Sequence, residues 1–364
     1  MTNAPTTGSP VATSGGSTSA GRMGGRAREV ALRMGGLVLA IAIVVIVFTY
    51  LARPNTFLTL QNSMGMLRFM STYAIVALGL TLVIVVGEID LSFGYMYGLA
   101  ASLIAVAWVV WGWPVWAAIL LAFAAAVLVG CFNAFFVTVL KIPSFIVTLG
   151  SGQLIFGTTL FITNTATFNP AYPPAGKVID PGELAFFRGF AQQDLFFRLP
   201  GQPETVSDYL FPMQGIWMIG VALLVGFVLS RTLFGFRLKA IGGNPAAAEL
   251  ARLPVRKYKF GAFIICAALA SLAALLDFSF IESTQPNAGL SLLFPVFAAV
   301  IIGGASLSGG RGTAVGTVLG AMLLAIISNG LSLLAVGPSV YNFVSGSVTI
   351  AAVALDRLAN SLRR

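Results

Sequence analysis

Residues 66–94 decide the fold of this chain, and they read MLRFMSTYAIVALGLTLVIVVGEIDLSFG. Positions 66–86 carry a single charge and are long enough to cross a bilayer as a helix, since about 20 apolar residues are needed. The run stops at Gly87, and two acids, Glu88 and Asp90, follow before the next apolar run begins. This pattern predicts two membrane-spanning helices joined by a short polar break.

The composition of the whole chain agrees with a membrane protein. Of the 364 residues, 57% are hydrophobic and 9% are charged, with a mean hydropathy of +0.92. Soluble domains carry about 25% charged residues. We therefore predict an all-α membrane protein with about ten transmembrane helices, near 35–52, 66–86, 93–112, 114–140, 145–163, 212–230, 260–280, 291–306, 313–334 and 339–356.

The placement of the basic residues predicts the orientation. The net charge is +9, yet the Lys and Arg residues gather between apolar blocks, which argues against nucleic acid as a partner. With the N-terminus inside, sixteen of the 21 basic residues lie on the inner side. Cytoplasmic loops carry such an excess. Both termini are therefore expected in the cytoplasm.

Several kinds of chemistry are excluded by residue type. The chain has no histidine, so it offers no Ser-His or Cys-His nucleophile and no imidazole metal ligand. Its two cysteines, Cys131 and Cys266, lie inside apolar runs and are expected to be buried thiols. We expect no catalytic residue, no metal site and no cofactor in this chain, and hence no enzyme.

The apolar runs also set the domain boundaries. Residues 1–34 are predicted to be a disordered cytoplasmic tail, because the first part is rich in Ser, Thr, Gly and Pro. Residues 35–358 form the transmembrane domain, and 359–364 form a short cytoplasmic tail. Two long hydrophilic connections interrupt the domain. Residues 164–211 should lie outside as a small cap, and residues 231–259 should lie inside.

The break between the second and third spans is the first candidate site. Ionisable groups at membrane depth are costly and usually functional. Glu88, Asp90 and Ser92 are therefore candidates for the translocation path or its gate. A short cytoplasmic loop in which Asp90 or Ser92 caps the next helix remains equally open. Asn133 and Asn329 lie within spans, and each either makes a packing hydrogen bond or lines the path.

The inner loop carries a second signal. Gly242-Gly243-Asn244-Pro245 predicts a turn and a helix start, with Asn244 as the N-cap and the proline at the first helical position. The short Ala-rich helix that follows includes Ala247 and Ala248. Such a small helix cannot bury a core of its own. It suits docking into a groove on a partner, although a merely solvated basic loop is the alternative.

A third signal is a glycine-rich stretch near residue 305. Its spacing resembles a phosphate-binding loop, but the required lysine is absent and no strand precedes it. We predict a tight interhelical turn, followed by glycines at four-residue spacing that allow close helix packing. The residues of this turn and packing face are Gly303, Gly304, Gly309, Gly310, Arg311, Gly312, Gly316 and Gly320.

Together these segments resemble the permease subunit of the ribose/xylose/galactose class of bacterial ABC sugar importers. The resemblance covers about residues 35–358. It rests on four segments in the right order, which are GEIDLS at 87–92, KIPSFIVTLG at 141–150, AIGGNP at 240–245 and IIGGASLSGGRG at 301–312.

The resemblance implies partners and roles. It implies a dimeric pore, made with a second permease copy or a paralogue, that is fed by a periplasmic sugar-binding protein. A cytoplasmic ABC ATPase would hold the ATP and Mg and drive transport. Gly242, Gly243, Asn244, Ala247 and Ala248 would face that ATPase. In the second matching segment, Phe145 and Thr148 join the expected path.

Two departures from the family pattern leave the substrate open. Leu292–Phe297 stands where members often carry an acidic stretch, and the outer loop 164–211 is longer than in ribose-type members. The expected substrate is a pentose, a hexose or a related polyol. An ABC permease for another solute, such as a nucleoside or branched-chain amino acid, and a self-powered carrier remain the alternatives.

Overall fold

The computed structural model of the protein describes residues 19–197 and 209–361. The chain divides into two compact units, Met1–Gly36 and Leu37–Arg364.

The first unit contains the start of helix α1 (Ser19–Leu51). The sequence predicted a disordered tail as far as residue 34. Residues 1–18 lie outside the described part, and 19–34 belong to helix α1. Seven of the fifteen residues between 20 and 34 are Ala or Arg, which are good helix formers.

The described part of the second unit is almost entirely helical. Its elements after α1 are α2 (Leu60–Val85), α3 (Phe93–Ala105) with a π-helical turn η1 (Val106–Val110), α4 (Val115–Thr138), α5 (Ser144–Thr163), α6 (Pro181–Arg188), α7 (Met213–Arg231), α8 (Leu233–Gly243), α9 (Pro245–Leu250), α10 (Val255–Ile281), the 3-10 helix η2 (Ala288–Leu292), α11 (Leu293–Ile302), α12 (Ala314–Leu333) and α13 (Pro338–Ser361). One short antiparallel hairpin, β1 (Leu195–Phe197) with β2 (Tyr209–Phe211), departs from the all-α prediction.

Eight helices in the described residues are long and apolar enough to cross a membrane. They correspond to eight of the ten predicted spans. The predicted span 291–306 matches the shorter apolar stretch Ala288–Ile302, which is a 3-10 turn followed by a ten-residue helix. The predicted span 339–356 falls in α13, which is not one of the eight. The chain is thus a multi-pass helical membrane protein.

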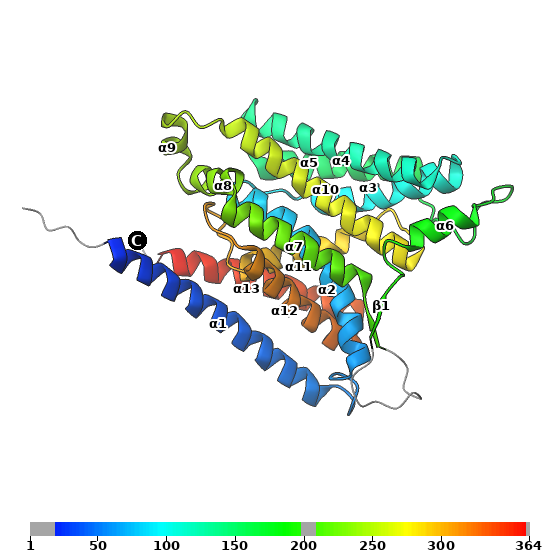
Figure 1. Ribbon diagram of the computed structural model, residues 1–364, viewed down its shortest axis with the longest axis horizontal. Helices are drawn as coiled ribbons and strands as arrows, with labels where there is room; N and C mark the ends of the chain where they lie inside the picture. The colour runs from blue at the N-terminus through cyan, green and yellow to red at the C-terminus, as the bar shows by residue number, and fades with distance from the viewer. Residues whose placement is uncertain (1–18, 198–208, 362–364) are drawn as a thin grey trace, which may run out of the picture. The chain divides into compact units, whose positions relative to one another are not determined.

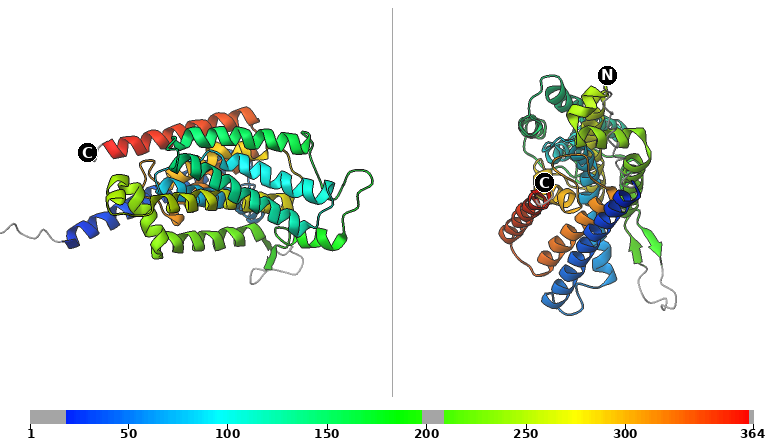
Figure 2. Two further views of the ribbon diagram at one scale, coloured as in Figure 1. Left: turned by 90° about the horizontal axis from the view of Figure 1, so that it is seen from above. Right: turned by 90° about the vertical axis from the view of Figure 1, so that its left-hand side faces the viewer.

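Figures 1 and 2 show the long helices running between two ends of the second unit. We call the end that holds α8 and α9 the α9 end, and the opposite end, with α6 and the hairpin, the α6 end. Helix α2 runs towards the α9 end, α3 returns towards the α6 end, and α13 finishes at the α9 end. Helix α6 begins at Asp180, whose carboxylate accepts the Gly182 and Glu183 N–H groups.

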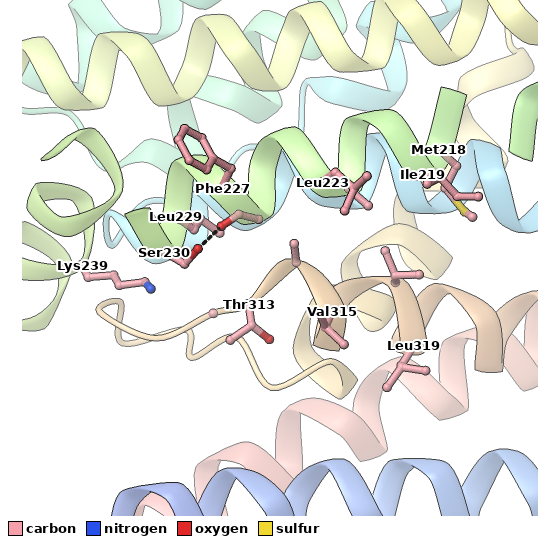
Figure 3. Close-up of a pocket in the computed structure, with 15 residues that line it drawn as sticks. Met218, Ile219, Leu223, Phe227, Leu229, Ser230, Lys239, Thr313, Val315 and Leu319 are labelled. Carbon is pink, nitrogen blue, oxygen red and sulfur yellow. Dashed lines mark hydrogen bonds between the residues drawn. The ribbon is translucent and has the colours of Figure 1, made fainter. Parts of the chain in front are cut away.

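Helices α7 and α12 leave an apolar groove of about 520 Å³ between them (Figure 3). Its walls are side chains such as Leu223 and Phe227 of α7 and Val315 of α12. These three side chains are largely exposed. The groove therefore lies on the outer surface of the unit.

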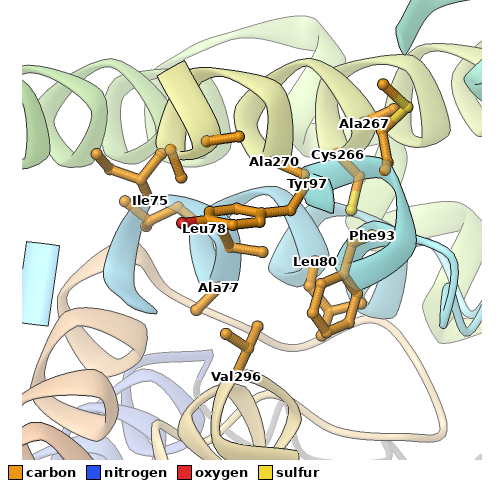
Figure 4. Packing of buried hydrophobic residues seen from close by; sticks show 14 of the residues in the cluster. Ile75, Ala77, Leu78, Leu80, Phe93, Tyr97, Cys266, Ala267, Ala270 and Val296 are labelled. Atoms are coloured by element: carbon orange, nitrogen blue, oxygen red, sulfur yellow. The ribbon is translucent and has the colours of Figure 1, made fainter. Parts of the chain in front are cut away.

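Helix α2 forms the centre of the core. Every residue from Met70 to Val85 is buried, as expected of a helix that is apolar on all sides. Figure 4 shows Ile75, Leu78 and Leu80 of α2 packed among residues of α3, α10 and α11. A change in the buried part of α2, which includes its end at Val85, therefore affects several neighbouring helices.

Candidate functional site: the break after α2 and the glycine junction

The break begins where α2 ends in a left-handed turn. Gly87 has φ +90°, a conformation that glycine adopts without strain. Its N–H donates to the Ile84 carbonyl at 3.0 Å, and the Glu88 N–H donates to the Val83 carbonyl at 3.0 Å. These bonds satisfy carbonyls at the helix end. Glycine at this position lets the chain reverse directly after the helix.

The chain from Glu88 to Ser92 then runs back into the interior. Glu88 forms an ion pair with Lys259, and the Asp90 carboxyl faces Cys266. Lys259 and Cys266 are seven residues apart on α10, which is about 10 Å along a helix axis. The segment therefore runs along α10 from Lys259 to Cys266. Helix α3 starts near Cys266, deeper in the bundle than the end of α2.

Polar side chains of α5 satisfy the backbone of the break. The Ile89 N–H donates to Ser144 Oγ at 3.0 Å, and Thr148 Oγ1 donates to the Ile89 carbonyl at 3.3 Å. Thr148 is fully buried and Ser144 nearly so. Non-helical backbone at membrane depth is tolerated only where protein groups satisfy it. Helix α5 thus supplies the partners that the break requires.

Asp90, Ser92 and Asn133 form a buried chain of hydrogen bonds. Asp90 Oδ1 accepts the Ser92 N–H at 2.7 Å and the Ser92 hydroxyl at 2.6 Å. Asn133 Nδ2 of α4 donates to Ser92 Oγ at 2.8 Å. All three residues are 1% exposed or less. Asp90 therefore closes the turn before α3, and α4 holds that turn in place.

A junction of glycines lies at the end of α2. Gly242 at the end of α8 lies so close to α2 that a Cβ atom there would be 2.0 Å from the Val85 carbonyl oxygen. The Gly310 N–H donates to this same oxygen at 2.9 Å. A Cβ on Gly310 would be 2.7 Å from the Gly243 Cα. We call Val85, Gly242, Gly243, Gly309 and Gly310 the glycine junction.

The helix α9 begins next to this junction. Asn244 caps it, since its Oδ1 accepts the Ala247 N–H at 3.0 Å, and Pro245 is its first residue. Ala247 is exposed, whereas Ala248 is 4% exposed. The predicted start and the capping residue are confirmed. The first turn of the helix presents small side chains to solvent, Glu249 and Leu250 are exposed at its end, and Ala248 anchors it.

The glycine-rich stretch forms a turn between α11 and α12. Gly304 and Gly309 have positive φ, and Arg311 donates to Ser306 Oγ at 3.4 Å. The two helices then pack backbone to backbone. A Cβ at any of the remaining glycines of this set would come within 2.6 Å of another atom, and these are Gly303, Gly312, Gly316 and Gly320. This part of the chain is built for close packing.

Two of the predicted path residues lie away from the break. Phe145 of α5 has a side chain that is 49% exposed. Asn329 of α12 pairs with Asn62 of α2, with each amide donating to the other at 2.9 and 3.0 Å. The structure thus gathers Glu88, Asp90 and their partners, but not these two.

A polar cluster inside the bundle was not predicted from the sequence. Asp277 of α10 accepts the Tyr97 hydroxyl at 2.6 Å and the Thr72 hydroxyl at 2.7 Å. The hydroxyl residues within the apolar runs of α2 and α3 were the sequence feature that could have indicated a buried polar cluster. Their spacing did not indicate which acid they would meet.

Hydrogen bonds and an ion pair hold the connection between α5 and α7 against the α6 end of the bundle. The Glu183 carboxylate accepts the Trp108 indole N–H at 2.8 Å, and the Arg188 guanidinium forms a two-point ion pair with Glu282. The hydrogen bonds from Arg188 lower the pKa of the Glu282 carboxyl, and the same contact raises the pKa of Arg188. Phe187 of α6 is fully buried.

Comparison with known proteins points to one family of permeases. Residues 62–353 match the family described as the permease component of the branched-chain amino acid transport system. The xylose transport system permease protein of Escherichia coli is 32% identical, over 88% of this chain and 90% of its own length. The ribose import permease protein of Escherichia coli is 33% identical, over 88% of this chain and 92% of its own length.

A third relative has a less specific name. It is a probable ABC transporter permease protein of Sinorhizobium fredii, 33% identical over 79% of each chain. No solved structure is significantly similar to the chain.

Proposed function

Since this chain belongs to the ABC importer permease family that contains the xylose and ribose permeases, we propose that it translocates a monosaccharide across a bacterial inner membrane. The substrate class follows from the relatives, whose names specify xylose and ribose. A pentose is the first candidate, followed by a hexose or a polyol.

The glycine junction carries this proposal. It brings the end of α8, which leads directly into the capped helix α9, into contact with the end of the central helix α2 and with Gly87 at the start of the break. A partner that pushes on α8 and α9 would move the α8 backbone. That backbone contacts the chain at Gly87 directly, with no flexible side chain in between. That is the connection an importer needs between its energy source and its gate.

A cytoplasmic ABC ATPase is the proposed partner at the α9 end. It would bind ATP and Mg and dock on Asn244, Ala247 and the neighbouring face of α9. The excess of Lys and Arg expected on this side supports a cytoplasmic location for the α9 end and for both termini. A periplasmic sugar-binding protein would then deliver its cargo at the α6 end, and a second permease copy or a paralogue would complete the pore.

We propose that the break is the structural part of the gate that sets the position of α3. Asp90, Ser92 and Asn133 are enclosed by protein and hydrogen-bonded to one another. We assign to them, and to Thr148, the role of positioning α3, with Glu88 and Lys259 as the anchor at the α9 end. The exposed Phe145 and the Asn62–Asn329 pair would lie on the path or at the contact with the second copy.

Uptake of labelled solutes tests the proposal. A strain that lacks the gene is compared with the same strain after complementation, using labelled xylose, ribose, myo-inositol and leucine. We expect complementation to restore uptake of a sugar or a polyol and to leave leucine uptake unchanged. Restoration of leucine uptake alone would overturn the sugar assignment and favour the solute that the family description names.

A further inference from the structure

The groove between α7 and α12 has one charged group at one end. Fifteen residues line it, and Lys239 of α8 is the only ionisable side chain among them. Figure 3 shows the Lys239 amino group between Ser230 and Thr313, at the mouth of the groove at the α9 end. The rest of the lining is mostly apolar. The groove therefore has an amphiphilic pattern, with a cationic end and an apolar length.

Lys239 has no acidic partner in the part of the chain that the structure describes. It is half-buried, and this burial lowers the pKa of its ammonium group. The neighbouring hydroxyls already have partners. Ser230 Oγ donates to the Gly226 carbonyl at 2.6 Å, and Thr313 Oγ1 accepts the Gly316 N–H at 3.1 Å. An anion at this end would meet an uncompensated cation.

The dimensions of the groove fit a chain molecule. Met218 and Ser230 lie twelve residues apart on α7, which is about 18 Å along the helix. Half of a bilayer's hydrocarbon core is about 15 Å thick. A 20-residue helix, about 10 Å wide and 30 Å long, would fill roughly 2,400 Å³, whereas the groove holds about 520 Å³. An extended acyl chain can lie within the groove, whereas a partner helix is too large to enter it and would have to lie across it.

We propose that this groove binds an anionic phospholipid, with its phosphate at Lys239 and one acyl chain along α7 and α12. Basic pockets between membrane helices at a membrane surface attract anionic lipid headgroups. The exposed Leu223, Phe227 and Val315 side chains would contact the chain. The proposal goes beyond sugar transport.

Binding of defined lipids to the purified full-length protein tests the site. Native mass spectrometry counts the phosphatidylglycerol or phosphatidylcholine molecules retained. We expect phosphatidylglycerol to bind about fivefold more tightly, the factor expected for one lysine facing an anionic lipid. Lys239→Gln should remove this preference. The matched control is Lys257→Gln, which changes an exposed lysine outside the groove and should retain the preference.

A second variant tests the acyl part of the site. Val315→Trp places a large side chain in the groove from an exposed position, so it should fold normally and weaken binding of both lipids. Equal lipid binding by the parent protein and Lys239→Gln would overturn the proposal, as would full binding by Val315→Trp. A Leu223→Cys variant that cross-links two copies, in a background without Cys131 and Cys266, would show that a second copy covers the groove instead.

Discussion

At the scale of single residues, one oxygen atom of Asp90 holds the break. Its Oδ1 accepts both the Ser92 N–H and the Ser92 hydroxyl, while Asn133 donates to that hydroxyl from α4. The carboxylate is 1% exposed. These contacts show that the Asp90 carboxylate fixes the backbone of the turn before α3. Any role in contacting a sugar would require the surrounding helices to separate.

Two substitutions of Asp90 separate positioning from charge. Asn retains an acceptor Oδ1, so Asp90→Asn should keep a substantial share of uptake. Asp90→Ala leaves two buried donors unpaired, at a cost of about 1–3 kcal/mol each, and should lower both the membrane level and uptake strongly. The measurement is sugar uptake normalised to protein in the membrane. Equal loss in both variants at equal protein level would show that the charge itself is required.

At the scale of elements, α9 depends on its N-cap. A helix of six residues has little stability of its own, and loss of an N-cap costs about 0.5–2 kcal/mol. The Asn244 side chain is exposed and makes its hydrogen bond to Ala247 locally. Changes here should therefore leave the bundle intact and affect only the order of α9.

Asn244→Ala should weaken capture of the ATPase and reduce uptake, because the first turn of α9 loses its acceptor. Asn244→Ser is the matched control, since Ser caps helices about as well as Asn. Co-purification of the ATPase with each variant provides the measurement. If the alanine and serine variants capture the ATPase equally well, α9 is not the docking element.

A second element, α6, is held by a pH-dependent contact. The pKa of Glu282 is lower in the folded protein because Arg188 stabilises its carboxylate. The contact therefore adds stability above the unfolded pKa of Glu, about 4.3, and that stability is lost as the pH falls through the lower folded value. Arg188 stays charged throughout.

Hydrogen exchange of the α6 amides should accordingly rise as the pH falls below about 4.3, after correction for the intrinsic exchange rate. Glu282→Gln should show faster exchange at neutral pH and a flat dependence over the same range. A variant with the parental pH profile would mean that another group fastens α6.

At the scale of the whole molecule, the proposed orientation puts the α9 end in the cytoplasm. Sixteen of 21 basic residues support it. Single cysteines at Val178 and Arg252, both exposed, probe the two ends in a background without Cys131 and Cys266. A membrane-impermeant thiol reagent should label the first site in intact cells and the second only after lysis. The opposite pattern would invert the topology.

Much of this arrangement could be predicted from local patterns. Apolar runs of about 20 residues mark spans, and Asn244-Pro245 marks a helix start through local capping. The contacts that assemble the site could not be predicted, because they join distant segments. Nothing in the sequence around Val85 indicates that Gly242 and Gly310 approach it. Likewise, Ser144 and Thr148 look like ordinary helix residues until the Ile89 backbone lies against them.

The central claim is that α8 and α9 move the gate through the glycine junction, and Gly242 tests it most directly. A Cβ at Gly242 would collide with the Val85 carbonyl, whereas at Gly243 its nearest neighbour would be 3.9 Å away. In proteoliposomes with the ATPase and binding protein, sugar uptake per ATP hydrolysed should fall about tenfold in Gly242→Ala, a loss on the order of one decade. It should stay near the parental value in Gly243→Ala. A parental ratio in Gly242→Ala would contradict the account.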